Sequence, residues 1–549
     1  MISLTTLVLL GLALATSALL MVAKIFKIGQ RPAGLPPGPP TMPLLGNLHL
    51  MPTKRPHLQF QKWAKQYGPI YSLILGTKTM IVLSSDEAVK DLLDKRSGIY
   101  SDRPETFIGQ EIASGGLRLV LMRYGSNWRM IHRMIHKTLN ILVAATYVPY
   151  QDLENKVLLV GMLDSPDDLL RHIRRASYSL STQMIFGFRC ISNEDPKLLQ
   201  LFHGFDKWSA LAGSASAQLA DLYPALQKLP EWIAPNVKYA RELHKTEKKM
   251  YLGHWDRAKA AIVNGTGLPC FCNDIYRAQL TDGFSDDAAG YISGSLLDAG
   301  SDSTASTLYG FVQAMLLWPD VQRRGQEEVD RVVGQDRLPT MEDYDQLPFV
   351  RCCIKETLRW MPTVVLGVPH AVIKDDNYLG YNIPKGSTII NNVWTIHMDE
   401  TRCPEPRVFN PDRYKDVDST LYQSVIGDVS KRENFVFGAG RRLCQGVHIA
   451  ERSLFLAISR FFWAFDLSPA KDKHGNPIKY DPEDLVGGLT VQPADFPAVI
   501  EPRSQYRAAV VRKEAEECQR YLDPETLQWL RVPEGMFLVV VLMRPGELE

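Results

Sequence analysis

The chain has 549 residues, of which 45% are hydrophobic and 22% charged, with a formal net charge of +1 at pH 7. This balance excludes an intrinsically disordered chain and gives no sign of nucleic-acid binding through overall positive charge. The eight cysteines are scattered and form no C-x-x-C, which predicts a reducing compartment without a disulfide framework.

A membrane anchor is the first predicted element, over residues 1–23. The run Leu4–Ala23 carries no charge and is long enough to cross a bilayer as a helix, in contact with membrane lipid. Lys24, Lys27 and Arg31 follow it, so the positive-inside rule places the main body in the cytoplasm. A cleaved signal peptide is the alternative, but no positive residue precedes the apolar run. We therefore predict a single-pass anchor.

Three further regions follow the anchor. Residues 24–41 are a basic, proline-rich linker whose PPGPP segment favours a stiff, extended spacer. Residues 42–504 read as one domain, and residues 505–549 as a C-terminal extension. Within that extension the apolar run 536–543 is too short to cross a membrane.

The hydrophobic pattern of the domain predicts a mostly α fold with small β-sheets (α+β). A hairpin is expected over 70–83, and a helical pattern covers 82–94. Further helices are predicted over 126–142, 169–186, 235–264, 285–318 and 447–465, and strands of a second small sheet over 378–381 and 388–394.

The long helix 285–318 carries the segment 299–304 (AGSDST) at its middle. A carboxylate and several hydroxyls in a buried helix are costly unless they are used. Ser303 can donate to the carbonyl of Ala299 one turn earlier, which bends or widens the helix beside Gly300. The alternative is an ordinary helix whose serines merely bond back to their own backbone.

Two segments that follow predict an ion-pair network. Glu356 and Arg359 lie three residues apart on a short helix, so they share a face and can pair. An isolated pair of this kind is usually solvated and weak. The segment 409–414 (FNPDRY) follows and supplies a second arginine, Arg413.

Residues 437–446 (FGAGRRLCQG) are the most informative segment. Cys444 lies in a glycine-rich loop just before a predicted helix, whose N-terminus favours a thiolate over a thiol. A thiolate is a strong axial ligand for haem iron. The alternatives are a buried structural cysteine or half of a zinc site with His448, but a zinc site needs about four ligands.

This segment matches the haem-binding signature F-x-x-G-x-R-x-C-x-G at every fixed position, so the chain resembles the cytochrome P450 superfamily. Residues 299–304 resemble its oxygen-activation motif, 355–359 its E-x-x-R, 409–414 its P-E-R-F element and 128–133 (WRMIHR) its W-R-x-x-R motif. The resemblance covers roughly residues 36–504. It is of the microsomal type and is closest to filamentous-fungal members of secondary metabolism.

The resemblance implies a haem b site in which Cys444 is the fifth iron ligand. Arg442 would pair with a haem propionate, and Phe437 would shield the sulfur from water. Gly440 and Gly446 would let the backbone pass close under the porphyrin. The same resemblance gives Trp128, His132 and His370 propionate contacts, with His132 standing where the family has arginine.

The family's acid–alcohol relay falls on Asp302, Ser303 and Thr304, and Ser303 stands where the first threonine is expected. The resemblance assigns Glu356, Arg359 and Arg413 to folding and haem retention. Electrons would come from NADPH through a flavoprotein, NADPH–cytochrome P450 reductase, with cytochrome b5 as a second donor. The basic stripe Arg129, Arg133 and Lys137, extended by Arg441, would receive the flavoprotein.

The expected activity is a dioxygen-dependent monooxygenase of the endoplasmic reticulum membrane that hydroxylates or further oxidises a medium-sized apolar substrate. A fungal polyketide, alkaloid or terpenoid is the expected substrate type, in a pocket that includes Val364, Val365, Leu366, Gly488 and Leu489. Two alternatives remain at this stage. One is a haem-thiolate isomerase or dehydratase, and the other is a non-catalytic haem-binding membrane module.

Overall fold

The structure is a computed structural model, which describes residues 6, 9, 12–17, 19–20 and 27–534. Part of the predicted anchor and the whole apolar run 536–543 lie outside these residues. In the part of the chain that is described, no helix combines the length and the apolar character needed to cross a bilayer.

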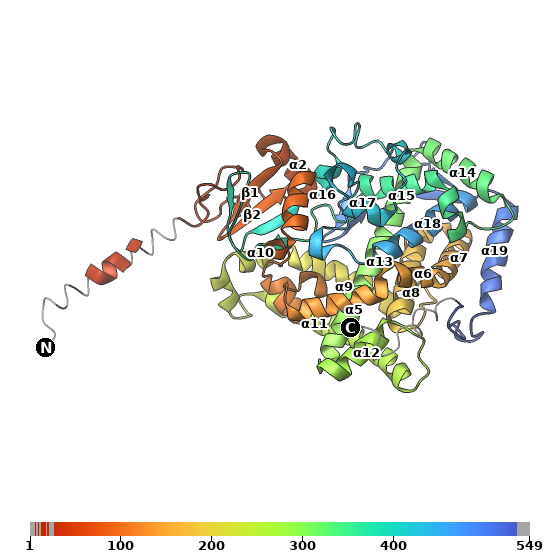
Figure 1. Ribbon diagram of the computed structural model, residues 1–549, viewed down its shortest axis with the longest axis horizontal. Coiled ribbons are helices and arrows are strands. Elements are labelled where there is room, and N and C mark those ends of the chain that lie inside the picture. The colour runs from red at the N-terminus through yellow and green to blue at the C-terminus, as the bar shows by residue number, and fades with distance from the viewer. Residues whose placement is uncertain (1–5, 7–8, 10–11, 18, 21–26, 535–549) are drawn as a thin grey trace.

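The body is mostly helical with small sheets, as predicted (Figure 1). Its α-helices are α2 (Pro56–Tyr67), α3 (Asp86–Val89), α4 (Ser97–Tyr100), α5 (Ser126–Leu139), α6 (Ile141–Thr146), α7 (Val148–Asp164), α8 (Leu169–Phe186), α9 (Pro196–Ala212), α10 (Ala215–Leu222), α11 (Pro235–Val263), α12 (Phe271–Asp282), α13 (Asp286–Leu317), α14 (Pro319–Val333), α15 (Pro348–Trp360), α16 (Val393–His397), α17 (Leu421–Ile426), α18 (Val447–Ala464) and α19 (Gln505–Gln519). Its strands are β1 (Ile70–Leu75), β2 (Lys78–Leu83), β3 (His370–Ala371), β4 (Asp376–Tyr378), β5 (Tyr381–Ile383), β6 (Thr388–Asn391), β7 (Phe465–Pro469), β8 (Leu485–Gly487), β9 (Val491–Pro493) and β10 (Ala498–Pro502). The short 3-10 and π helices used below are η2 (Lys90–Lys95), η3 (Phe107–Ile112) and η4 (Leu119–Leu121).

The sheets confirm one strand prediction and correct another. β1 and β2 form the predicted hairpin, with Ile70 opposite Leu83. β6 does not belong to a second sheet, because it pairs in parallel with β2 and completes a four-stranded sheet in the order β1-β2-β6-β3. β4 and β5 form a separate small hairpin. From Val393 onward the predicted strand is instead helix α16.

The predicted helices match the structure except where a polar cap intervenes. α8 spans the predicted residues, and α13 begins after its N-cap Ser285, whose hydroxyl accepts from the Ala288 amide. The pattern 126–142 is broken at Asn140, whose side chain accepts from the first amides of α6. The pattern 82–94 starts late, because its first two residues belong to β2 and the helix begins after Ser85.

The central helix α13 organises the core. It packs against α8 and α11 on one side and against α15 and α18 on the other (Figure 1). The largest hydrophobic cluster joins its second half to α18, and it includes Phe311, Phe455, Phe461 and Trp463. The first half of α13 packs with α8, α11 and α12 in a second cluster. This arrangement places the segment 299–304 between the two clusters.

The described part of the C-terminal extension is built into the domain. α19 packs against α7, and its Val511 belongs to the main core. Further along, Trp529 is buried with Tyr147 and Tyr150, and its indole N–H donates to the Gln183 side chain at 2.6 Å. Residues 505–534 are therefore part of the folded body.

Candidate functional site

The cysteine loop is fixed by hydrogen bonds to helix η2. The Gly440 amide donates to Asp94 at 2.6 Å, and the same carboxylate pairs with Arg432, which also donates to the Gly438 carbonyl. Gly440 has φ +58, and a Cβ there would lie 1.9 Å from the Leu93 carbonyl oxygen, so only glycine fits. The Cys444 amide closes the loop by donating to the Phe437 carbonyl at 2.9 Å.

The Cys444 side chain is exposed, although burial in the surrounding protein raises the pKa of its thiol. A thiol can be both accessible and surrounded by protein if it borders an open space inside the body. The raised pKa favours the thiol, whereas the sequence predicted a thiolate. The reason is that α18 begins three residues later, at Val447, so only the Gly446 amide favours the charged form of Cys444. A bound metal cation would deprotonate the thiol outright.

The central helix shows matching uncovered surface. Ala299 and Gly300 are exposed, whereas their neighbours Asp298 and Ser301 are buried. Uncovered residues at the middle of a core helix, together with an accessible thiol, fit a cofactor held between α13 and the cysteine loop. The zinc alternative lacks ligands, because no described group of three His, Cys, Asp or Glu residues could hold a metal ion.

The acid–alcohol residues lie on this stretch of α13. Ser303 Oγ donates to the Ala299 carbonyl at 2.7 Å, as predicted. Asp302 turns toward the β8–β9 turn, where Thr490 Oγ1 donates to Asp302 Oδ2. Burial raises the pKa of Asp302, so its carboxyl group holds a proton more readily than an exposed aspartate does.

The buried Arg103 and His370 and the partly buried Arg442 form a cluster in which neither arginine is paired with a carboxylate. Arg442 donates to the carbonyls of Ser101 and Met122, and desolvation lowers its pKa to about 10. Burial and the positive charge of Arg103 lower the pKa of His370, whose ring bonds the Tyr100 carbonyl. The nearby Asp102 is already paired with Arg123. Such a cluster fits the two carboxylates of haem.

Arg103 was missed by sequence reasoning. It is 5% exposed and donates only to backbone carbonyls, those of Val120, Val368 and Pro369. Burial lowers its pKa well below the ordinary value. The local sequence Asp102-Arg103-Pro104 looks like an exposed turn, so only the distant carbonyl partners reveal the buried charge.

Trp128 and His132 lie beside this cluster. Their rings are 4.5 Å apart, and the Arg442 guanidinium lies 4.1 Å from the Trp128 ring centre. Desolvation lowers the pKa of His132, so the neutral ring is favoured in this structure.

The predicted ion-pair network is assembled and buried. Glu356 accepts two bonds from Arg359, both 2.7 Å, and one from the Asn410 amide at 2.8 Å. Arg413 reaches the same carboxylate at 3.4 Å. This network ties α15 to the segment that precedes the cysteine loop.

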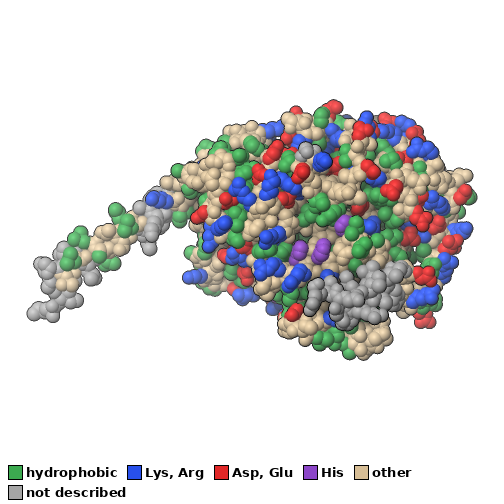
Figure 2. Space-filling model, in the orientation of Figure 1, with side chains coloured by type: hydrophobic (Ala, Val, Ile, Leu, Met, Phe, Trp, Pro, Cys, Tyr) green, Lys and Arg blue, Asp and Glu red, His purple; other side chains and the backbone are tan. Residues whose placement is uncertain are grey.

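The predicted basic stripe lies on one face of α5. Arg129, Arg133 and Lys137 are exposed, and so is Arg441 from the cysteine loop. Arg441 donates to the Tyr124 hydroxyl at 2.6 Å, which joins the loop to the start of the stripe. Figure 2 shows lysine, arginine and histidine side chains gathered near the centre of this face, where Figure 1 places α5.

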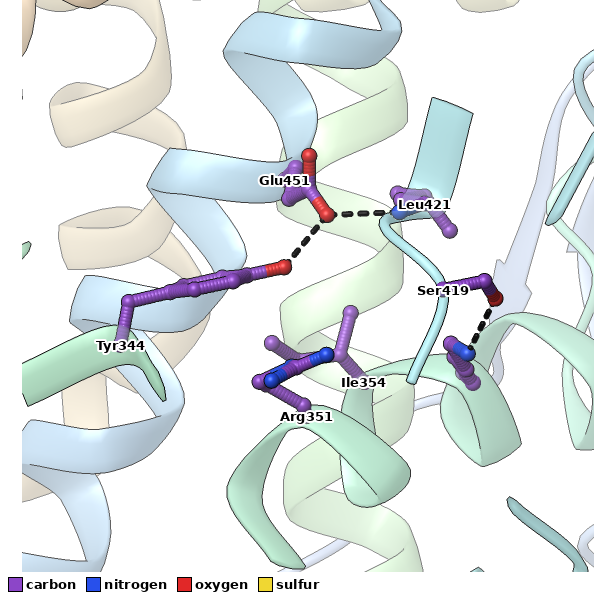
Figure 3. Close-up of a pocket in the computed structure, with 7 residues that line it drawn as sticks. Tyr344, Arg351, Ile354, Ser419, Leu421 and Glu451 are labelled. Carbon is purple, nitrogen blue, oxygen red and sulfur yellow. Dashed lines mark hydrogen bonds between the residues drawn. The ribbon is translucent and has the colours of Figure 1, made fainter. Parts of the chain in front are cut away.

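A separate small pocket lies between α15, α17 and α18, and polar groups that line it bond to one another (Figure 3). Glu451 accepts from the Tyr344 hydroxyl and from the Leu421 amide, both at 2.6 Å. Lys355 donates to Ser419 at 2.8 Å. These bonds link α17 and α18 to each other and α15 to Ser419.

Comparison with known proteins places the chain in a family. The cytochrome P450 family model matches residues 36–495. The chain is 54% identical to cytochrome P450 monooxygenase virE of Hypocrea virens, over 94% of each chain. It is 48% identical to cytochrome P450 monooxygenase fogE of Aspergillus ruber, over 95% of this chain and 98% of the relative.

A further relative is cytochrome P450 monooxygenase fsoB of Humicola fuscoatra, which is 48% identical over 93% of this chain and 94% of its own. A family model that spans most of the chain, together with these identities, settles membership. Haem iron is the family's cofactor, and such enzymes need dioxygen, a substrate and a redox partner. The chain is therefore a fungal-type member of the cytochrome P450 family and a monooxygenase.

Proposed function

We propose that this chain is anchored in the endoplasmic reticulum membrane, faces the cytoplasm and takes electrons from NADPH–cytochrome P450 reductase, with cytochrome b5 as an auxiliary donor. Its substrate would be a medium-sized apolar secondary metabolite of polyketide, alkaloid or terpenoid type. The observation that carries the proposal is the accessible Cys444 thiol, held in a loop beside a core helix whose residues 299–300 are uncovered.

In this proposal the haem supplies oxygen activation and hydrogen abstraction, and the protein supplies an iron ligand, anchoring charges and protons. Cys444 is the ligand, and the glycines of its loop keep the backbone close to it. Arg442, Arg103 and His370 would hold the propionates, with Trp128 and His132 packed alongside. The buried Glu356 network keeps the loop in place.

Proton delivery would use the acid and the hydroxyl of α13. At rest Ser303 Oγ bonds the Ala299 carbonyl and Asp302 bonds Thr490. Rotation of either side chain would turn a proton toward the uncovered face of the helix. Because burial raises the pKa of Asp302, its carboxyl group can carry that proton and recover it from solvent. Thr304 lies next to this pair. An isomerase would not need these groups.

The apolar substrate class is supported by the residues expected to line the pocket. Val365 is buried, and Leu366 and Leu489 are partly buried. The Leu489 amide donates to Ser209 at 2.8 Å, so the β8–β9 turn is fixed to α9. A rigid apolar wall selects substrates by shape and desolvation.

The reductase proposal is supported by the exposed basic stripe on α5. A cluster of positive charge steers an acidic flavoprotein and makes its association sensitive to salt. Reversing two of these charges, in R133E/K137E, should lower reductase-supported turnover about tenfold at low ionic strength and less at high salt. The carbon monoxide spectrum of that variant should be unchanged.

The decisive experiment combines the purified protein with reductase, NADPH and candidate substrates. Substrate-dependent consumption of NADPH and dioxygen supports the monooxygenase. Conversion of a peroxide without NADPH would instead support an isomerase or dehydratase. If neither reaction is observed, the result supports a non-catalytic haem-binding module. Microsomes that contain the chain, incubated with extracts of a strain lacking its gene, would then reveal the substrate as the compound consumed.

A further inference from the structure

A second buried ionic cluster, centred on Arg118, has no part in the function proposed above. Arg118 is 2% exposed and lies in the loop between η3 and η4. One of its terminal nitrogens donates to Asp298 at 2.8 Å and the other to Glu247 at 2.6 Å. Its guanidinium also lies 4.1 Å from the ring centre of Trp208. A single side chain thereby joins this loop to α13, α11 and α9.

The cluster is tightly built around Asp298, one helical turn before Asp302. Tyr251 donates to Asp298 Oδ2 at 2.6 Å, the oxygen that Arg118 also uses. The other oxygen, Asp298 Oδ1, is buried and has no hydrogen-bond partner in the described structure. Removing any member would leave a buried charge or hydroxyl without its partner, which is costly.

The residues directly after Arg118 lead to the positive cluster at the haem site. The Leu119 amide donates to Ser295 of α13 at 3.3 Å. The Val120 carbonyl accepts from Arg103 at 3.0 Å, and the Met122 carbonyl accepts from Arg442 at 2.7 Å. Segment 118–122, which we call the strap, is thus fastened at one end to the central helix and at the other to both arginines.

We propose that Arg118 is a positioning residue for the oxidation site. It fastens the strap between α13 and the arginine pair Arg103 and Arg442, and thereby holds closed a route by which small ligands reach the iron. The proposal relies on the haem site for its readout, and it is independent of the substrate and of the reductase.

The charge of the cluster makes this fastening depend on pH. Two carboxylates face one guanidinium, and burial raises the pKa of Glu247 from 4.5 to about 7. The charged and titratable groups around Glu247 are Arg118 from the strap, Asp298 and Tyr291 from α13, and Tyr251 from α11. On α9 Gly204 lies against Glu247, since a Cβ at Gly204 would be 3.9 Å from the Glu247 Oε1 atom.

Proton linkage determines whether the closed form gains or loses stability as the pH rises. When the strap is released and Glu247 is solvated, its pKa returns toward 4.5, so the closed form binds more protons between pH 4.5 and about 7. The closed form therefore loses stability as the pH rises through this interval. The loss levels off above the higher value, where Glu247 is ionised in both forms.

The test measures how fast carbon monoxide binds to the dithionite-reduced protein, since this ligand does not titrate. For the wild type we expect the rate to rise about threefold or more from pH 5.5 to 7.5. Glu247→Gln keeps an acceptor for Arg118 but leaves one carboxylate against one guanidinium. Its rate should stay at the slow, low-pH value throughout.

Arg118→Met should bind carbon monoxide roughly fivefold to tenfold faster than the wild type at pH 6. It should also lose hydrogen-exchange protection over the strap. The matched control is Arg460→Met, which removes an equally buried arginine paired with Asp152 and Asn155 outside this cluster. That control should leave the rate and the strap's protection at wild-type values.

Two results would overturn the proposal. One is a Glu247→Gln protein that keeps the wild-type pH profile, and the other is an Arg118→Met protein no faster than Arg460→Met. If Arg118→Met does not fold, the Glu247→Gln profile decides alone. A wild-type protein without the red-shifted, thiolate-type carbon monoxide band would contradict the haem site instead, so the two failures are distinguishable.

Discussion

Arg103 and Arg359 are both buried guanidinium groups, yet their surroundings are opposite. Arg359 forms two bonds to the Glu356 carboxylate, whereas Arg103 finds only carbonyl oxygens. Accordingly the pKa of Arg359 is raised, although burial opposes this, and that of Arg103 is lowered by burial. A buried guanidinium that is paired with a carboxylate of the protein stabilises the fold, and we call such a pair a structural lock. A buried guanidinium without a counterion marks a place where an external anion can bind.

Cys444→Ser is the change with the largest expected effect, because it removes the expected iron ligand of the haem whose propionate would pair with Arg103. Without the thiolate the iron loses its axial ligand. We expect the thiolate-type carbon monoxide band to disappear and monooxygenase turnover to fall by about a hundredfold or more. The carbon monoxide difference spectrum of the purified variant checks this. An unchanged spectrum would contradict the assignment.

Glu356→Gln tests the lock. It leaves Arg359 and Arg413 without a carboxylate, and breaking a buried pair costs about 3–5 kcal/mol of the free energy of unfolding. Urea unfolding should show this loss in both the haem-free and the haem-bound protein. Glu327→Gln, in the exposed pair with Arg323, is the control and should change the free energy of unfolding by less than about 1 kcal/mol.

Arg103→Met should separate the two kinds of buried charge. In the haem-free protein it removes a desolvated cation, so the unfolding free energy should stay equal or rise. In the haem-bound protein it removes a propionate partner, and haem loss to an acceptor protein should become about tenfold faster. Equal destabilisation of both forms, as expected for Glu356→Gln, would show that Arg103 is only a structural lock.

Ser303→Thr should have the smallest effect. It restores the methyl group that limits rotation of the hydroxyl, while keeping the donor to the Ala299 carbonyl. Product formed per NADPH consumed should rise by up to about threefold, with less hydrogen peroxide released. Equal or poorer coupling would show that the serine hydroxyl is already held in its productive orientation.

Local motifs predicted much of this molecule because their partners are near in sequence or fixed by helix geometry. The Ser303 bond to Ala299 follows from one helical turn, and the Glu356 pair with Arg359 from a spacing of three. The length of α13 follows from its cap and its apolar run. These features needed no knowledge of the rest of the chain.

The features that were missed depend on distant partners. Arg103 is held by carbonyls at 368 and 369, and Arg118 by carboxylates at 247 and 298. Likewise β6 joins β2 across more than 300 residues, which alternation within the strand does not encode. The break of the pattern 126–142 was locally readable, since Asn140 is a favourable N-cap residue, and so was the late start of the pattern 82–94 after Ser85.

The docking of residues 505–534 has a consequence for biosynthesis. Arg189 pairs with the buried Glu154 and also donates to the Leu527 carbonyl at 2.6 Å, so an early part of the core is closed by a residue 338 positions later in the chain. Until residues 505–534 have been translated and can fold, the surface around Tyr147 and Tyr150 lacks their cover and is open to chaperones. Truncation before Trp529 should therefore reduce the yield of folded protein.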